Sequence, residues 1–265
     1  MFKDKVVAIT GAASGIGRAL AVETAAQAAR LALADLNLRA LQETVSLLVP
    51  GTSVRAYELD VSSRDAVFGF ADSVQRDFGA AHFIVNNAGT ATLAAFDHVT
   101  LEEIEKVLAI NLWGVIYGTK AFLPIMQLQR EGCIVNISSV FGLVATPCSV
   151  AYTISKFGVR GLTETLWYEL EGTGVRAVLV HPGGINTNIS KTPEAKFAGE
   201  FERRVAEGNL RQMTTAPADC ARQIVEGLKR GDKRLLVGNG AKTLHWISRL
   251  FPDGYVALMR RKLGV

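Results

Sequence analysis

Short apolar runs rich in Val, Ile and Ala alternate along the chain with longer segments whose apolar residues recur at helical spacing. The short runs are almost continuously hydrophobic, as expected for strands of a parallel sheet that is covered on both faces. We predict strands at residues 5–10, 30–35, 53–59, 82–86, 132–137, 175–180 and 234–237. We predict helices at residues 16–29, 38–48, 64–78, 101–128, 151–171 and 217–229.

This alternation predicts an α/β fold with a doubly wound, Rossmann-like parallel sheet of about seven strands and helices on both faces. No Gly/Ser/Pro-rich linker divides the 265 residues, and no internal repeat is visible. Hydrophobic residues make up 49% of the chain, which is enough for one large core. We therefore expect residues 1–265 to form a single domain.

Two segments interrupt the alternation. Residues 188–215 are polar and are broken by Pro193, Gly199 and Gly208, so we predict a substrate-loop insertion at the carboxyl end of the sheet, where ligands bind in such folds. Residues 241–265 are predicted to form a helical tail that mixes apolar and basic side chains. The tail could cover a substrate pocket, pack on another subunit or lie on a membrane surface. Packing within or between subunits is the interpretation we prefer.

Charge and composition exclude several classes of protein. The net charge is only +4, and no block of like charges indicates a nucleic-acid partner. The N-terminus has no signal-peptide architecture, and we see no stretch that is long and apolar enough to span a bilayer. Cys133, Cys148 and Cys220 cannot all pair within the chain and lack metal-ligand spacing. We therefore expect a cytoplasmic protein without a metal site.

A glycine-rich loop follows the first predicted strand and opens a helix. Backbone amides at a helix N-terminus attract a pyrophosphate, and glycines let the backbone approach it closely. A glycine-rich turn without a ligand is the alternative, but the strand–loop–helix context favours a dinucleotide site. The phosphate-binding residues that we predict are Gly11, Ser14, Gly15, Ile16 and Gly17.

The second predicted strand ends at Asp35, 18 residues after Gly17. A carboxylate here can accept hydrogen bonds from the adenosine ribose hydroxyls and would repel a 2′-phosphate, so NAD is favoured over NADP. Capping of the following helix is the alternative role of this carboxylate. Arg18 and Arg39 could partly restore NADP binding, so NADP is not excluded.

Further cofactor contacts are predicted where later strands end. Asp60 and Val61 follow the third strand and would lie beside the adenine. Asn87, Ala88 and Gly89 follow the fourth strand, where small residues permit close approach of the backbone to the cofactor. Ordinary turn chemistry is the alternative. The repeated position at the carboxyl ends of strands favours cofactor binding.

Ser139, Tyr152 and Lys156 are the candidate chemical group. Tyr152 and Lys156 are four positions apart on a predicted helix, so their side chains share one face. A nearby ammonium stabilises a phenolate and is expected to lower the Tyr152 pKa from its usual value of about 10. Ser139 ends the fifth strand, from which it can hydrogen-bond a substrate oxygen. Together with the glycine loop, these residues indicate proton transfer next to a nicotinamide.

In order and spacing these motifs resemble those of the short-chain dehydrogenases/reductases over nearly the whole chain, from residue 5 to about residue 237. The family motifs TGxxxGxG, NNAG and YxxxK match residues 10–17, 86–89 and 152–156. The resemblance implies that Asn111 completes a catalytic tetrad. It also implies further cofactor contacts at Pro182, Gly183, Ile185 and Thr187.

The resemblance implies an NAD(P)-dependent oxidoreductase that interconverts a secondary alcohol and a ketone or aldehyde. Tyr152 would act as general acid/base, and Lys156 would lower its pKa and bind the nicotinamide ribose. Ser139 would polarise the substrate oxygen, and Asn111 would support a water relay. Family resemblance also implies a homo-tetramer or homo-dimer formed through the helices at 101–128 and 151–171. A catalytically silent dinucleotide sensor of the same fold is the alternative function.

The substrate itself is predicted only by side-chain character. The pocket wall is expected to include residues 91–96, 141–150 and 185–213. Its apolar members favour a hydrophobic alcohol such as a steroid, a retinoid or a medium-chain aliphatic alcohol. They are Leu93, Phe96, Phe141, Leu143, Val144 and Ile189. His181, which precedes Pro182, is interpreted as a hydrogen-bonded structural residue rather than a catalytic base.

Overall fold

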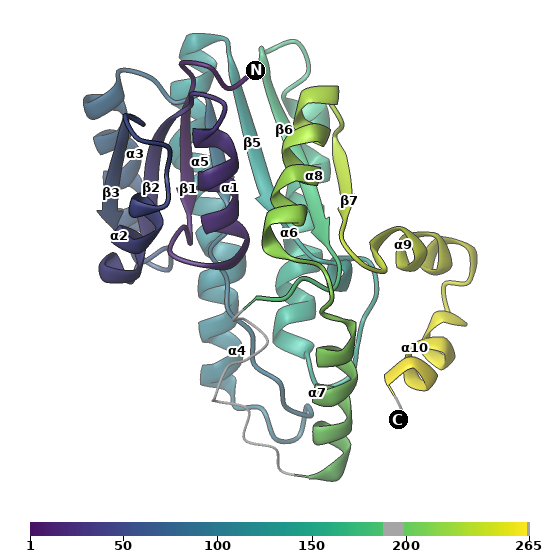
Figure 1. Cartoon of the computed structure of the whole chain (residues 1–265). Coiled ribbons are helices and arrows are strands. Elements are labelled where there is room, and N and C mark those ends of the chain that lie inside the picture. The colour runs from purple at the N-terminus through teal and green to yellow at the C-terminus, as the bar shows by residue number, and fades with distance from the viewer. Residues whose placement is uncertain (188–198, 264–265) are drawn as a thin grey trace.

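The computed structural model describes residues 1–187 and 199–263. Seven strands form one sheet in the order β3-β2-β1-β4-β5-β6-β7, and every neighbouring pair is parallel (Figure 1). The strands are β1 (Val6–Thr10), β2 (Arg30–Asp35), β3 (Val54–Glu58), β4 (Phe83–Asn86), β5 (Gly132–Ile137), β6 (Val175–Pro182) and β7 (Arg234–Val237). The predicted doubly wound fold in a single domain is confirmed. The strand order reverses between β1 and β4, which makes their carboxyl ends the expected ligand site.

Helices cover both faces of this sheet (Figure 1). One face carries α1 (Gly15–Ala25), α2 (Leu38–Ser46) and α8 (Pro217–Arg230). The other face carries α3 (Arg64–Phe78), α5 (Gly114–Gln129) and α6 (Val150–Glu169). Beyond the carboxyl end of the sheet lie α4 (Leu101–Leu108), α7 (Glu200–Gln212), α9 (Ala241–Leu250) and α10 (Tyr255–Leu263).

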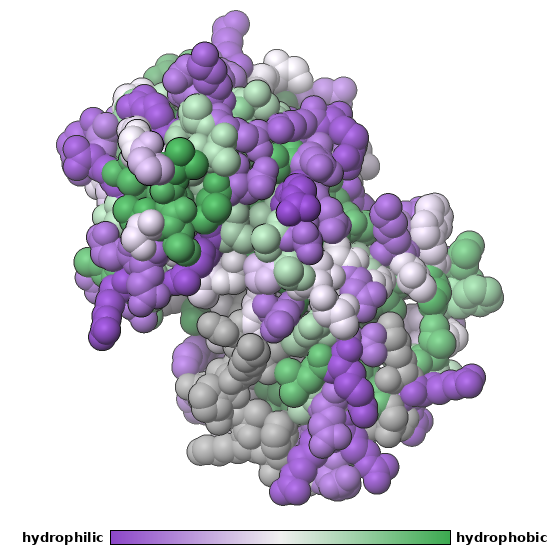
Figure 2. Space-filling model, in the orientation of Figure 1, coloured by the Kyte–Doolittle hydropathy of each residue, from purple (hydrophilic) through white to green (hydrophobic). Residues whose placement is uncertain are grey.

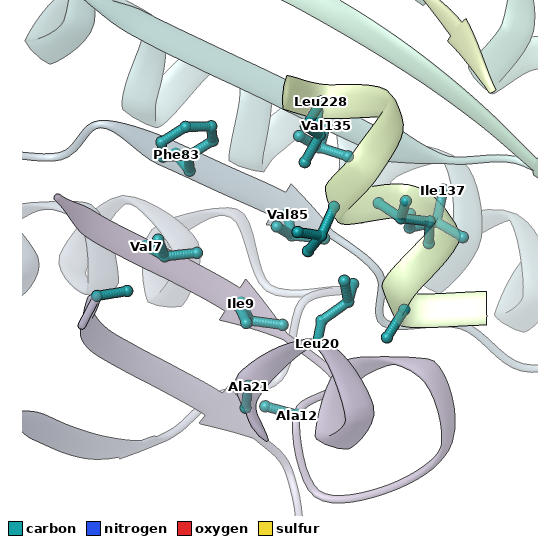
Figure 3. Packing of buried hydrophobic residues seen from close by; sticks show 14 of the residues in the cluster. Val7, Ile9, Ala12, Leu20, Ala21, Phe83, Val85, Val135, Ile137 and Leu228 are labelled. Carbon is teal, nitrogen blue, oxygen red and sulfur yellow. The ribbon is translucent and has the colours of Figure 1, made fainter. Parts of the chain in front are cut away.

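Alternation along β1 explains why both faces are apolar. Val7 and Ile9 belong to the cluster formed with α1 and α8, and Figure 3 shows them on the same side of the sheet as Leu20 of α1. Val6 and Ala8 belong to the opposite cluster, with α3 and α5. Successive side chains of a strand point to opposite faces, so a strand between two helical layers must be hydrophobic at every position.

Several predicted boundaries differ from the structure. The helix predicted at residues 16–29 ends at Ala25, because Ala28 adopts a left-handed conformation (φ 58°) as the chain turns into β2. The insertion at residues 188–215 is not entirely a loop, since α7 lies within it; residues 188–198 are outside the described part. The predicted helical tail consists of two helices, α9 and α10, joined at residues 251–254.

The helix predicted at residues 101–128 is interrupted by a π-helical turn at Ala109–Trp113, which separates α4 from α5. By length and composition the whole segment Leu101–Gln129 is apolar enough to cross a membrane, with a mean hydropathy of 1.3 in its best window. The expectation that no such stretch exists is therefore wrong. Phe122 and Met126 of this segment are fully buried against the sheet, as in the core helix of a globular fold.

Candidate active site

The glycine loop between β1 and α1 is held against the end of β4. Gly11 has a left-handed backbone (φ +65°), and a Cβ there would lie 2.7 Å from the Cα of Ala88. A Cβ on Gly17 would lie 2.2 Å from the carbonyl oxygen of Gly11. The side-chain amide of Asn87 donates to the carbonyl oxygens of Thr10 (2.9 Å) and Gly11 (3.1 Å). These contacts require glycine and fix the loop at the start of α1, where the first helical amides have no acceptor within the helix.

A cavity of about 300 Å³ lies over this loop and contains most of the predicted cofactor residues. Most of its lining residues lie at the carboxyl ends of β1, β2, β3 and β4 or just after them, and Ile110 and Thr187 come from later segments. Among the predicted residues it is lined by Gly11, Ser14, Gly15, Ile16, Asp35, Asp60, Val61, Asn87, Ala88, Gly89 and Thr187. Gly17 is buried behind the loop and does not line the cavity. Sequence analysis did not identify Leu36, Leu59, Thr90 and Ile110, which complete the wall.

Asp35 projects into this cavity and does not cap α2. One carboxylate oxygen accepts the backbone N–H of Ala13 at 2.9 Å, and the other accepts the N–H of Asn37 at 3.0 Å. Asn37 is the residue that caps α2, because its side chain accepts the N–H of Ala40. Helix capping, the alternative role for Asp35, is therefore not what the structure shows.

Arg18 is committed to contacts behind the glycine loop. Its guanidinium donates to the carbonyl oxygen of Ala13, to the hydroxyl of Thr44 and to the carboxylate of Glu43. Arg39 is exposed on α2 and does not line the cavity. Among the residues that line the cavity, the charged side chains are thus Asp35 and Asp60, both acidic.

A second cavity, of about 500 Å³, contains the candidate chemical group. Ser139, Tyr152 and Lys156 line it, together with the predicted residues Pro182, Gly183, Ile185 and Thr187. The two cavities share wall residues at the glycine loop, after β4 and after β6, namely Ile16, Asn87, Gly89 and Thr187. An elongated ligand can therefore extend from Asp35 to Tyr152.

Burial shifts the pKa values of Lys156 and Tyr152. The ammonium of Lys156 donates to the carbonyl oxygen of Ile137 at 3.0 Å and lies 5.5 Å from the centre of the Tyr152 ring. Burial lowers the pKa of Lys156 to about 8. Burial also raises the pKa of Tyr152 above its usual value, and a hydrogen bond with the Ser139 side chain offsets only part of this effect. The predicted lowering of the Tyr152 pKa by Lys156 is wrong for this structure, because desolvation of the phenolate dominates.

Asn111 lies behind the cavity wall, in the π-helical turn between α4 and α5. It is fully buried, and its side-chain amide donates to the carbonyl oxygen of Thr90 (2.8 Å) and to the hydroxyl of Ser155 (3.2 Å). Its side-chain oxygen accepts the backbone N–H of Thr90 at 2.8 Å. Asn111 does not line either cavity, so it connects the loop after β4 to the helix that carries Tyr152.

His181 contacts the backbone of Ser139, and Ser138 contacts the backbone of Lys156. The Nδ1 atom of His181 lies 2.8 Å from the carbonyl oxygen of Ser139, so Nδ1 carries the proton and donates it. Burial lowers the pKa of His181 to about 4, which keeps the ring neutral. The hydroxyl of Ser138 donates to the carbonyl oxygen of Lys156 at 2.9 Å. The interpretation of His181 as a structural residue agrees with these contacts.

The wall of the larger cavity is only partly the one predicted. Leu93 and Phe141 line it, whereas Phe96 is exposed and Val144 packs in a separate cluster with α9 and α10. Leu143 does not line the cavity, and Ile189 lies outside the described residues. The tail supplies further apolar wall residues that no motif indicated, namely Leu244, Met259 and Leu263. Asn239 and Gly240 were also missed, although their position after β7 could have indicated them.

The titratable residues of the described part of the chain form no metal centre. Within residues 1–187 and 199–263, no group of three or more His, Cys, Asp or Glu side chains is arranged to hold a metal ion. Cys133, Cys148 and Cys220 are buried free thiols. Burial raises the pKa of the Cys148 thiol to about 11, which disfavours a thiolate near the site.

Comparison with known proteins agrees with this geometry. The chain is similar to the putative oxidoreductase SadH of Mycobacterium tuberculosis, with 40% identity over 268 residues that cover 97% of this chain and 95% of the relative. It is also similar to estradiol 17-beta-dehydrogenase 11 of Homo sapiens, with 30% identity over 98% of this chain and 84% of the relative.

A solved structure shows the same fold over nearly the full length. The crystal structure of a short chain dehydrogenase/reductase from Burkholderia phymatum in complex with NAD superimposes with a TM-score of 0.86, 29% identity and 96% coverage of both chains. The family model described as short chain dehydrogenase matches residues 5–197. Motifs, fold, cavities and relatives agree, and the chain therefore belongs to the short-chain dehydrogenase family of oxidoreductases.

Proposed function

We propose that this protein is an NAD-dependent oxidoreductase that interconverts an apolar secondary alcohol and its ketone, with Tyr152 as the proton-transfer group. The observation that carries the proposal is the pair of neighbouring cavities that share wall residues. One cavity contains Asp35 and the glycine loop, and the other contains Tyr152, Lys156 and Ser139. This arrangement accommodates a dinucleotide at one end and a reacting carbon at the other.

The residues present fit a nicotinamide dinucleotide. The amides at the start of α1 face the smaller cavity and suit a pyrophosphate, while Asp35 suits the ribose hydroxyls. The acidic lining of the cavity favours NAD over NADP. The guanidinium of Arg18 already donates to Ala13 and Glu43, so it does not offset this charge for a 2′-phosphate. A solved relative is in complex with NAD, which supports this preference. When bound, the dinucleotide takes up hydride in alcohol oxidation and supplies it in carbonyl reduction.

Residues of the chain itself transfer the proton and position the substrate. In reduction, the phenol of Tyr152 donates its proton to the carbonyl oxygen, and in oxidation the phenolate accepts the hydroxyl proton. Ser139 holds the substrate oxygen through its hydroxyl. Lys156 positions the cofactor end of the site, and Asn111 holds the loop and helix in register. Because the raised pKa keeps Tyr152 protonated at neutral pH, alcohol oxidation is expected to become faster as the pH rises.

An apolar substrate is supported by the cavity wall. Leu210 and Met213 at the end of α7 face the same space as Leu244, Met259 and Phe141. A wall of this kind stabilises a bulky hydrocarbon and gives little to hold a polyol. One of the relatives carries the name of an estradiol dehydrogenase, which supports a hydrophobic alcohol as substrate.

Cofactor titration and turnover on one preparation test the proposal. NADH and NADPH binding are measured by fluorescence, and apolar secondary alcohols and ketones are screened with wild type, Tyr152→Phe and Tyr168→Phe. Tyr168 is exposed on the same helix and is the matched control. We expect NADH preference, and a loss of turnover of about 10²-fold or more in Tyr152→Phe only.

The other outcomes distinguish the alternatives. Tight NADH binding without Tyr152-dependent turnover on any substrate would support the dinucleotide sensor. No binding of either dinucleotide would contradict the proposed site itself. Equal loss of turnover in Tyr168→Phe would show that the effect is not specific to the cavity.

We further propose a cytoplasmic homo-oligomer. The helices implicated by family resemblance carry exposed apolar side chains, including Trp113, Ile154 and Phe157, which suit a subunit interface. The three buried free cysteines are compatible with a reducing compartment. Analytical ultracentrifugation of wild type and Ile154→Glu tests the interface, and a change to monomer is expected.

A further inference from the structure

The C-terminal helices α9 and α10 have an inner side that closes the substrate cavity. They extend beyond β7, to the side of the sheet (Figure 1). Leu244 and Met259 pack in one cluster with Val140 and also line the cavity. The Tyr255 hydroxyl accepts the backbone N–H of Ala145 at 3.2 Å, which attaches α10 to the loop after Ser139. The tail is therefore part of the cavity wall.

The outer side of the same helices is hydrophobic. Trp246, Leu250 and Phe251 are 59%, 66% and 62% exposed, and Val256 and Leu258 are also exposed. Figure 2 shows hydrophobic side chains at the right edge of the molecule, near the turn from α9 to α10, with hydrophilic ones beside them. Exposed apolar groups gathered in one place mark a contact surface.

Basic side chains are interspersed with these apolar ones. On α9 the exposed positions Lys242, Trp246 and Arg249 follow one another at helical spacing and lie on one face. Arg260 and Arg261 are exposed on α10. Among the described residues, none of these four cations has an acidic partner. We call the outward residues 242, 246, 249–251, 256, 258, 260 and 261 the outer tail face.

The charge balance of the chain makes this face distinctive. Residues 241–265 contain five of the 29 Lys and Arg residues and only one of the 25 acidic ones, Asp253. The first 240 residues are therefore electrically balanced, and the whole excess of +4 resides in the tail. A partner for this face has to offer both negative charge and a hydrophobic layer.

We propose that the outer tail face binds the surface of a bilayer that contains anionic lipids. Aromatic and aliphatic side chains enter the region between headgroups and acyl chains, while Lys and Arg contact the anionic headgroups. A second copy of this chain fits less well, since a twofold contact through this face would bring like charges together. The first 240 residues carry no excess negative charge that could neutralise the positive tail of a second copy.

Binding in this way would bring the wall of the substrate cavity next to the lipid. Leu244 of α9 lines the cavity, whereas Trp246, two positions later and therefore about 200° around the helix, is exposed. An apolar alcohol dissolved in the bilayer would then reach the site without crossing bulk water. This last step depends on the proposed function, whereas lipid binding does not.

Vesicle co-sedimentation of the full chain tests the proposal without any activity assay. The vesicles are phosphatidylcholine alone or phosphatidylcholine mixed with phosphatidylglycerol, at low salt and at about 0.5 M NaCl. The variants are Trp246→Ser with Phe251→Ser for the apolar part and Arg260→Glu for the charge. Matched controls are Leu47→Ser with Val49→Ser, exposed apolar residues near the end of α2, and Arg64→Glu, an exposed arginine on α3.

We expect binding to the mixed vesicles only, weakened by salt. Arg260→Glu should reduce the partition coefficient about fivefold or more, and the apolar pair about tenfold or more. The control variants should bind like wild type, and thermal melting of each variant checks its fold. Binding that is absent, or insensitive to both tail variants, would overturn the proposal. A tail variant that lowers the oligomer mass in ultracentrifugation, with no vesicle binding by wild type, would assign the face to a second copy instead.

Discussion

The charge on Asp35 is the residue-scale feature that we expect to select the cofactor. In Asp35→Asn the amide oxygen can still accept the N–H of Ala13, which holds the glycine loop, while the hydrogen bond from the N–H of Asn37 and the negative charge are lost. Repulsion of a 2′-phosphate should then disappear, and the ratio of NADPH to NADH affinity should rise roughly tenfold. Fluorescence titration with both dinucleotides measures this ratio.

Glu58 provides the matched control for Asp35. It pairs in register with Asp35 on the neighbouring strand but does not line the cavity. Glu58→Gln removes the same charge close by, and the affinity ratio should stay at its wild-type value. An equal rise in both variants would show that the general electrostatic field, and not the position of Asp35, discriminates between the dinucleotides.

Neutral, buried His181 should make stability depend on pH. Its pKa is about 4 in the folded protein against 6.5 for an ordinary histidine, so the unfolded chain binds more protons between these values. Stability is therefore lost as the pH falls from about 6.5 toward 4, by an amount on the order of 2 kcal/mol between pH 7 and pH 5. Urea unfolding at both pH values should show this decrease in wild type and a smaller one in His181→Gln.

His98 is the control, because its pKa is shifted in the opposite direction to the pKa of His181. It lies 3.0 Å from the carboxylate of Glu202, and this hydrogen bond raises its pKa. Its contribution is present at acidic pH and is lost as the pH rises through the folded pKa. His98→Gln should therefore not reduce the loss of stability between pH 7 and pH 5. If both variants flatten the pH dependence equally, the effect does not arise from burial of His181.

Most site residues could be predicted because their chemistry is local. Tyr152 and Lys156 share a helical face by spacing alone, and Asp35 ends a strand that the hydrophobic pattern identifies. The direction of the Tyr152 pKa could not be predicted, since it depends on burial by residues distant in sequence. The contact of His181 in β6 with the carbonyl of Ser139 in the loop after β5 joins positions 42 residues apart and leaves no local pattern either.

Helix α5 packs on β4 so closely that one position excludes any side chain. A Cβ on Gly118 would lie 2.1 Å from the side-chain oxygen of Asn86. The side-chain amide nitrogen of Asn86 donates to the side-chain oxygen of the buried Asn136, which limits how far Asn86 can move away. Gly118→Ala should force the helix from the sheet and lower the free energy of unfolding by about 1–3 kcal/mol. Urea unfolding with a fitted midpoint and slope measures this change.

Gly69 on α3 is the matched control for that contact. It is a glycine inside a helix, but no atom lies within 4 Å of a Cβ built there. Gly69→Ala should stabilise the protein by roughly 0.5–1 kcal/mol, since alanine loses less conformational freedom than glycine in a helix. Destabilisation by both substitutions would contradict the steric explanation for Gly118.

The sequence predicted helices and strands correctly where the hydrophobic periodicity is strong. It missed elements whose conformation depends on tertiary contacts. Hydrophobic runs located all seven strands to within one or two residues. The π-helical turn at Ala109–Trp113 was missed because its residues continue the helical apolar pattern without Gly or Pro. Helix α7 was missed because its composition is polar, and its order comes from Glu202 accepting the N–H of Ala95 in a distant loop.

At the scale of the whole molecule, the loops at the sheet edge and the C-terminal tail line different parts of the binding site. Loops after β1 to β4 line the smaller cavity, whereas the tail contributes only to the larger one. This division could not be predicted, because the sequence of residues 241–265 is compatible with covering a pocket, packing on a subunit or lying on a membrane. The structure shows the first of these for its inner side.

This division predicts that the two sides of the tail can be separated by mutation. Met259 is buried and lines the larger cavity, whereas Trp246 points outward. In a lipid-free assay Met259→Ala should raise KM for an apolar alcohol roughly tenfold and leave NADH affinity unchanged, because a wall contact is lost only at the substrate end. Trp246→Ser should change neither value. If Met259→Ala weakens NADH binding to the same extent, the tail supports the whole site, and its inner side does not serve the substrate alone.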